Sequence, residues 1–276
     1  PSCLQTFDGD AKAVGACVPI DNDPEIPGSN FGQPSMVVGS STVAAPYLLG
    51  GNAGDEIDYY RIKLGILNRT TGAAVASPNV ALSANRQMFS DVATDGQTYV
   101  ATWREDRVPP AQSGSLGAVY AARLDAEGKM VGTPILLSSG PSNLQGALGS
   151  NAPSPRVIFD GSKYIVAWGQ GVGGGGSDSD RVLSIFAAIL PSTGNLVVEK
   201  SITVPSSGGF GDVALSNDGK NTLLAFTRTS GFFFEISLAR ISNSTHDLID
   251  TQPKTISTPG GVRFAPREQP AQLEEQ

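Results

Sequence analysis

The chain has 276 residues, a formal net charge of −7 and only 19 Lys and Arg residues. This charge argues against nucleic acid and anionic membrane surfaces as partners, because phosphate binding needs clustered basic side chains. Charged residues make up 16% of the chain while Gly (33) and Pro (19) are abundant, which favours short strands joined by turns over a helical protein. No stretch approaches the roughly 20 apolar residues that span a bilayer, so we expect no transmembrane segment.

Residues 1–32 form an N-terminal segment that holds the only two cysteines, Cys3 and Cys17. In an oxidising compartment a disulfide between them would close a loop of roughly 15 residues, worth about 3 kcal/mol of loop-closure entropy. Two unpaired thiols are the alternative. The chain begins at Pro1 rather than Met, which indicates a removed targeting segment or a trimmed chain. We therefore expect an extracytoplasmic protein.

Three carboxylates in the same segment, Asp21, Asp23 and Glu25, stand at alternate positions. This spacing lets one loop wrap a calcium ion, although the run does not match the EF-hand pattern. A metal-free surface turn is the alternative. Calcium is the only cofactor that the sequence indicates.

Residues 33–257 contain a repeated unit. Each clear copy has an apolar stretch, an Asp-Gly turn and a second apolar stretch that ends in a large aromatic residue. A first, weaker copy has Ser40-Ser41 in place of the Asp-Gly turn. The Asp-Gly pairs are Asp95-Gly96, Asp160-Gly161 and Asp218-Gly219, and the aromatic residues are Trp103, Trp168 and Phe226.

Each copy predicts four antiparallel strands. In chain order we expect strands at 36–38, 43–49, 59–67 and 74–82; at 90–94, 98–103, 118–125 and 130–138; at 156–159, 164–168, 182–190 and 196–204; and at 213–215, 222–226, 232–241 and 247–256.

Sheets with apolar residues on both faces must be covered on both sides, and stacking around an axis achieves this. The sequence therefore predicts an all-β fold, a β-propeller of four-stranded antiparallel blades, in which Trp103, Trp168 and Phe226 pack between blades. A composite fifth blade from residues 4–9 and 261–265 would close the ring. A four-bladed ring and a longer array completed by another chain are the alternatives. Residues 258–276 form a C-terminal strand and a polar tail.

The connections on one face of this propeller vary in length and content, which is where such scaffolds keep binding surfaces. On this loop face, the densest charged groups are candidates for binding a polar ligand, with arginines as anion anchors and carboxylates as acceptors. Solvated charge on exposed loops is the alternative. The candidates are Arg104, Glu105, Asp106 and Arg107 in one connection and Asp178, Asp180 and Arg181 in another.

Catalytic residues are not evident. The single histidine, His246, lies in a predicted turn, and no Ser or Cys has a visible partner for nucleophilic catalysis. Carboxylate-dependent glycoside hydrolysis needs two acids that face each other about 5–9 Å apart. Asp91, Asp212, Glu105 and Asp106 are candidates, but nothing in the sequence pairs them.

The unit from Asp95 to Trp103 with residues 120–128, and from Asp160 to Trp168 with residues 187–194, resembles the degenerate propeller repeats of many secreted or lipid-anchored bacterial surface proteins. Such repeats specify architecture and not activity. The resemblance implies a cell-surface or envelope protein. We expect a non-catalytic binding or scaffold module with a protein or glycan partner. The alternatives are a carboxylate-dependent carbohydrate hydrolase or lyase and an accessory subunit of a filament or multi-subunit complex.

Overall fold

The computed structural model describes residues 3–7, 10, 12–19, 35–52, 58–80, 86–107, 116–138, 155–172, 182–205, 213–230 and 233–256. Within these ranges the chain contains strands, turns and loops and no helix, as its composition predicts. An N-terminal hairpin joins β1 (Cys3–Phe7) to β2 (Ala13–Pro19), and four four-stranded antiparallel sheets follow. We call them sheets I to IV, in chain order.

Each of these sheets is a meander in which every strand pairs with the next one along the chain. Sheet I holds β3 (Val37–Val38), β4 (Thr42–Asn52), β5 (Asp58–Asn68) and β6 (Ala74–Ala76); sheet II holds β7 (Arg86–Thr94), β8 (Tyr99–Arg107), β9 (Leu116–Leu124) and β10 (Met130–Leu136); sheet III holds β11 (Arg156–Phe159), β12 (Lys163–Val172), β13 (Val182–Pro191) and β14 (Lys200–Val204); sheet IV holds β15 (Val213–Asn217), β16 (Asn221–Ser230), β17 (Phe233–Ser242) and β18 (Lys254–Thr255).

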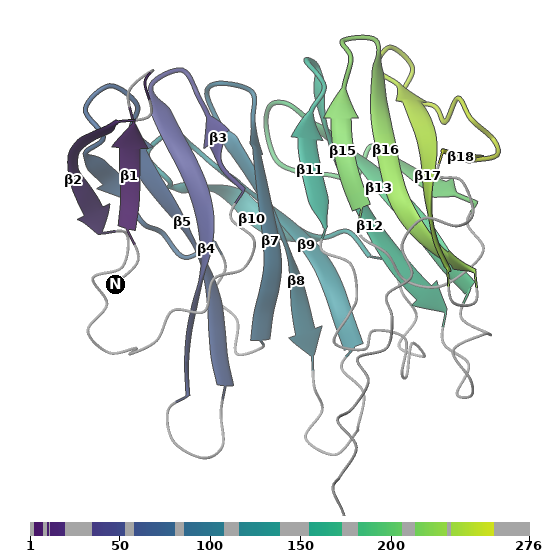
Figure 1. Ribbon diagram of the computed structural model, residues 1–276, viewed down its shortest axis with the longest axis horizontal. Coiled ribbons are helices and arrows are strands. Elements are labelled where there is room, and N and C mark those ends of the chain that lie inside the picture. The colour runs from purple at the N-terminus through teal and green to yellow at the C-terminus, as the bar shows by residue number, and fades with distance from the viewer. Residues whose placement is uncertain are drawn as a thin grey trace, which may run out of the picture.

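The sheets follow one another across the molecule, from the purple hairpin to sheet IV in green and yellow (Figure 1). The first strand of each sheet contacts the first strand of the next, so β3 meets β7, β7 meets β11 and β11 meets β15. Consecutive antiparallel sheets that meet along their first strands are the blades of a β-propeller. The predicted fold class is therefore confirmed.

The Asp-Gly turns are built alike in sheets II, III and IV. Gly96, Gly161 and Gly219 have φ values of 96°, 102° and 88°, which glycine adopts without a steric penalty. The preceding carboxylate accepts two backbone N–H groups of its own turn; for Asp95 these belong to Gln97 and Thr98, at 2.9 and 2.7 Å. Asp160 and Asp218 accept the equivalent pairs. The repeated dipeptide thus fixes the same hairpin three times.

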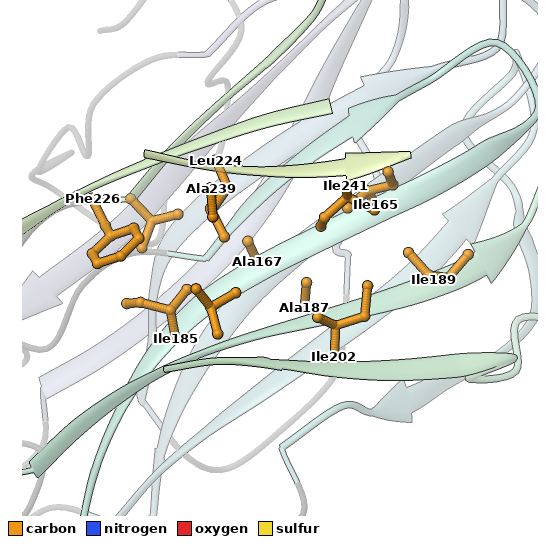
Figure 2. Packing of buried hydrophobic residues seen from close by; sticks show 12 residues of the cluster. Ile165, Ala167, Ile185, Ala187, Ile189, Ile202, Leu224, Phe226, Ala239 and Ile241 are labelled. Atoms are coloured by element: carbon orange, nitrogen blue, oxygen red, sulfur yellow. The ribbon is translucent and has the colours of Figure 1, made fainter. Parts of the chain in front are cut away.

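Both faces of sheets II and III are buried, because neighbouring residues of a strand point to opposite faces. In β12, Tyr164, Val166 and Trp168 belong to a core shared with sheet II, whereas Ile165 and Ala167 belong to a core shared with sheet IV. Figure 2 shows the second core, in which Ile185, Ala187 and Ile202 of sheet III lie below Leu224, Phe226 and Ala239 of sheet IV. Cover on both faces explains why residues 164–168 form an unbroken apolar run.

The large aromatic residues pack between blades as predicted. Trp103 is 1% exposed in the core between sheets I and II, and Trp168 is 4% exposed in the core between sheets II and III. Each indole also stacks on the ring opposite it in its own sheet, Tyr120 for Trp103 and Phe186 for Trp168, with centroids 5.7 and 6.0 Å apart.

Tyrosines tie sheets II and III each to the sheet before it. The Tyr99 hydroxyl lies 2.6 Å from Thr42 Oγ1 of sheet I, and the Tyr164 hydroxyl accepts the N–H of Asp95 in sheet II at 2.9 Å. Burial raises the pKa of Tyr164 to about 12, so the phenol stays protonated at neutral pH. Arg123 in β9 adds a further tie to sheet III by donating to the carbonyls of Pro191 and Gly194.

Several predicted boundaries are corrected. The second strands of the sheets continue well past the aromatic residue, so that β8 ends at Arg107 and β12 at Val172. The outer strands are shorter than predicted: β14 begins at Lys200 rather than at 196, and β18 spans only Lys254–Thr255. In the proposed fifth blade, residues 3–7 are a strand that pairs with β2, and residues 258–276 lie outside the described part of the chain. The closing blade therefore stays a prediction.

Candidate functional site

A group of buried polar and charged side chains lies on the first two strands of sheet II, β7 and β8. Gln87 and Asp91 in β7 are 0% and 7% exposed, and Arg104 and Glu105 in β8 are 2% and 5% exposed. The strand register places Gln87 opposite Glu105 and Asp91 opposite Thr102. Charged residues are seldom buried to this degree unless they are paired or functional, so we take this group as the candidate site.

The four side chains divide between the two faces of the sheet. Gln87 Oε1 accepts the N–H of Ile62 in sheet I at 3.0 Å, so Gln87 and the opposite Glu105 face sheet I. Asp91 Oδ2 accepts the N–H of Val157 in sheet III at 2.9 Å, so Asp91 faces sheet III. The site is therefore built into the contacts between consecutive blades.

This geometry excludes Asp91 and Glu105 as the two acids of a glycoside hydrolase. Asp91 and Glu105 point to opposite faces of the same sheet, so they do not face each other across a cleft as a retaining or inverting pair must. Asp212 lies outside the described residues, and the side chain of Asp106 is not described, although its backbone belongs to β8.

The location predicted for Arg104, Glu105, Asp106 and Arg107 is wrong. They were expected on an exposed loop, but all four belong to β8, where their backbones pair with Leu116–Val119 of β9. Arg104 and Glu105 are buried because sheet II is flanked by sheets I and III at this level. The role of these residues in ligand binding stays a prediction.

The other predicted site residues fall outside the described ranges or in the N-terminal hairpin. Asp178, Asp180 and Arg181 and the calcium candidates Asp21, Asp23 and Glu25 are outside the described ranges. Within those ranges, no three His, Cys, Asp or Glu side chains come together in a way that could hold a metal ion. For the predicted disulfide, Cys3 lies in β1 and Cys17 in the antiparallel β2, and the pairing of the two sulfurs stays a prediction.

His246 occupies a turn, as predicted, and has a partner that the sequence does not indicate. Its Nε2 lies 2.8 Å from Oδ2 of Asp160, the carboxylate of the Asp-Gly turn of sheet III. Burial by itself would raise the pKa of the Asp160 carboxyl, but hydrogen bonds from the N–H groups of Lys163 and Ser162 and from His246 outweigh it, and the pKa lies below its ordinary value of 3.8. His246 thus joins sheets IV and III.

A shallow hollow of about 360 Å³ opens along the first strands of sheets I, II and III. Apart from Thr94, the residues around it have apolar side chains, and none of these side chains is titratable. The lining residues are Met36, Val37, Val38, Val92, Ala93, Thr94, Val157, Ile158 and Phe159. The described ranges contain no helix long and apolar enough to cross a membrane.

No protein-family model matches the chain, and no curated protein matches it in sequence. Among solved structures, Trypanosoma rangeli sialidase in complex with 2,3-difluorosialic acid matches at 11% identity and a TM-score of 0.50 over 92% of this chain and 40% of that chain. A family 117 glycoside hydrolase of Zobellia galactanivorans matches at 9% identity and a TM-score of 0.49 (81% and 68%), and the hemagglutinin-neuraminidase of parainfluenza virus 5 with the ligand DANA at 8% and 0.48 (83% and 66%). This chain spans less than half of the sialidase and about two thirds of the other two proteins.

At these identities the matches establish the fold alone, and they agree with a propeller of four-stranded antiparallel sheets. They also correct the functional expectation. A non-catalytic scaffold was predicted, whereas the match with a TM-score of 0.50 is, by name, a sialidase. The scaffold interpretation is therefore withdrawn.

Proposed function

We propose that this protein is a carboxylate-dependent carbohydrate hydrolase whose substrate binds at the end of the propeller opposite the Asp-Gly turns. The observation that carries the proposal is the burial of Arg104 and Glu105 in β8. The shared fold with a sialidase supports the same class of reaction.

The repeat shows that these charges are not required by the fold. After the aromatic residue, sheet II continues with Arg104-Glu105, whereas sheet III continues with Gly169-Gln170 and sheet IV with Thr227-Arg228. A buried charge costs several kcal/mol of desolvation unless it is compensated. A charge pair that one blade carries and its sister blades lack is better explained by the function of that blade than by packing.

In this proposal Arg104 and Glu105 are positioning residues that fix the end of β8. The candidate reacting acids are Asp106, near the end of β8, and either Asp178 or Asp180 in the connection after β12. Arg107 and Arg181 anchor the substrate. One carboxyl protonates the glycosidic oxygen while the other acts as nucleophile or as base toward water, which requires a separation of about 5–9 Å. Arginine forks suit anionic or hydroxyl-rich sugars.

Hydrolysis of a panel of chromogenic glycosides and polysaccharides by the purified protein tests the proposal. The wild type should release product, and Asp106→Asn should lower kcat/KM by about 10²–10⁴-fold, the usual worth of a general acid or base. Glu127→Gln, in the exposed β9–β10 turn, is the matched control and should keep full activity. Failure to turn over any glycoside, or equal rates in both variants, would overturn the proposal.

The resemblance of the repeats to those of surface proteins further supports an extracytoplasmic site of action, as a secreted or lipid-anchored protein. We include in the proposal a Cys3–Cys17 disulfide, which would close the β1–β2 hairpin, and a calcium ion at Asp21, Asp23 and Glu25. Intact mass before and after reduction tests the disulfide. A calcium-dependent rise in Tm that Asp23→Asn abolishes tests the ion, because a ligand that binds only the folded state stabilises it.

A further inference from the structure

The Asp-Gly turns of sheets II, III and IV hold their carboxylates in the same way through one oxygen and differently through the other. In each turn the aspartate Oδ1 accepts two backbone N–H groups. Oδ2 of Asp95 accepts the Thr98 hydroxyl at 3.1 Å. Oδ2 of Asp160 lies 2.8 Å from Nε2 of His246. Two of the three carboxylates are therefore held at both oxygens.

The carboxylate in the turn of sheet IV is held less completely. Among the described residues, Oδ2 of Asp218 accepts one long hydrogen bond, from Nδ2 of Asn221 at 3.4 Å. Asp218 and Gly219 are both exposed. By contrast, Asp95 is partly exposed and the side chain of Asp160 is completely buried. Of these three carboxylates, that of Asp218 is therefore the most open to water and the least restrained.

An Asp-Gly pair is chemically labile because glycine has no side chain to shield its backbone nitrogen. That nitrogen can attack Cγ of the aspartate: the N–Cγ bond forms, the bond from Cγ to one carboxyl oxygen breaks, and water leaves with the amide proton. Water then opens the resulting succinimide ring at one of its two carbonyls. Opening at the backbone carbonyl leaves the main chain running through Cβ and Cγ. The product is isoaspartate, with the mass of the original residue.

We propose that Asp218 is a site of spontaneous conversion to isoaspartate, and that the folded structure protects Asp95 and Asp160. Before Cγ can reach the glycine nitrogen, the carboxylate must leave its hydrogen bonds. All three aspartates lose their two bonds from backbone N–H groups, so these bonds do not distinguish them. Asp160 must in addition break its bond to His246 in a buried position, and Asp95 must break its bond to Thr98.

The additional bond sets the expected difference in rate. A hydrogen bond to a charged group is strong enough to slow a reaction that must break it by about 10-fold or more. In the folded protein, isoaspartate should therefore form at Asp218 at least about 10-fold faster than at Asp160, with Asp95 between them. The product lengthens the backbone of the turn between β15 and β16, where Asn217 Oδ1 accepts a bond from Asn243 Nδ2. Conversion at Asp218 thus weakens a contact within sheet IV.

Peptide mapping of the full chain, aged in the folded state in mildly acidic buffer, tests this inference. Trypsin places the three aspartates on separate peptides, residues 87–104, 157–163 and 201–220. An isoaspartate peptide elutes apart from its parent at unchanged mass, and protein isoaspartate methyltransferase labels it. The label should collect in residues 201–220, and Asp218→Glu should abolish it there, because the longer side chain cannot close a five-membered ring. A fourth pair, Asp8-Gly9, lies on another tryptic peptide and outside the described residues.

Two controls assign the difference to the fold. In guanidinium chloride, where the chain is unfolded, Asp160 and Asp218 should convert at similar rates. His246→Gly should speed conversion at Asp160 by about 10-fold and leave Asp218 unchanged, because only Asp160 loses a partner. Equal rates at Asp160 and Asp218 in the folded protein would overturn the inference. So would a difference that persists in the unfolded chain, or a His246→Gly variant in which Asp160 stays as slow as before. The result does not depend on hydrolase activity.

Discussion

The hydrogen bond between His246 and Asp160 joins sheets IV and III, and its contribution to the free energy of unfolding can be predicted from the structure. His246 has φ 54°, in the left-handed region, at the turn position that Gly72, Gly128 and Gly194 occupy in the other sheets. A left-handed conformation costs a residue with a Cβ about 1–2 kcal/mol. The chain tolerates this strain because the imidazole reaches the Asp160 carboxylate, whose side chain is completely buried.

Replacement of His246 by Gly removes the strain and the bond together. A hydrogen bond to a charged group contributes about 1.5–3 kcal/mol, which exceeds the strain that is relieved. We therefore expect His246→Gly to lower the free energy of unfolding by about 1 kcal/mol and Tm by about 2–4 °C, as for a chain of this size. The variant should be less stable even though glycine is the residue that the other turns use.

Urea denaturation of four proteins measures this effect: wild type, His246→Gly, Asp160→Asn and the double variant. In the Asp160→Asn background, His246→Gly should lower the free energy of unfolding by less than half of the amount by which it lowers that of the wild type. Equal losses in both backgrounds would refute the reasoning, because the strain and the bond would then be unrelated. Since the pKa of Asp160 lies below 3.8 in the folded state, its contribution should be complete above pH 3.8 and disappear as the pH falls through the lower, folded-state pKa.

Two further substitutions test contacts between blades by urea denaturation. Gly128→Ala should destabilise by about 1–3 kcal/mol more than Gly219→Ala; both glycines have positive φ, but a Cβ at Gly128 would lie 2.8 Å from Ile66 Cδ1, whereas nothing lies within 4 Å of one at Gly219. Arg123→Met should lower stability by about 2 kcal/mol because it leaves the carbonyls of Pro191 and Gly194 without their donor, while the exposed Arg240→Met changes little. Equal losses within either matched pair would contradict the packing described here.

The sequence predicts the architecture because the repeat concentrates the information in a few positions. Asp-Gly marks the first turn of sheets II, III and IV, since that pair supplies both a carboxylate acceptor and a glycine with positive φ. The aromatic residue marks the face of the second strand that packs against the preceding sheet. Strand content and order follow from these two features alone.

The site was harder to predict because its local composition indicates an exposed loop and not a buried strand. Arg104 to Arg107 form a charged run that is typical of a loop, and only the flanking sheets, distant in sequence, bury the first two residues. The pairing of His246 with Asp160 spans 86 residues. The repeat does contain a signal for the pairing of His246 with Asp160. Sheet IV has Thr222 where sheets II and III have Tyr99 and Tyr164, and it has His246 where the other sheets have a turn glycine.

The claim on which the account depends is that consecutive sheets bury their faces against each other, and the fluorescence of the native protein tests it most directly. Trp103 and Trp168 are the only two tryptophans, and both lie between blades. Burial of both indoles between blades predicts blue-shifted emission that iodide does not quench until the protein unfolds. Red-shifted emission with strong iodide quenching in the folded protein would place the indoles in water and contradict the propeller packing.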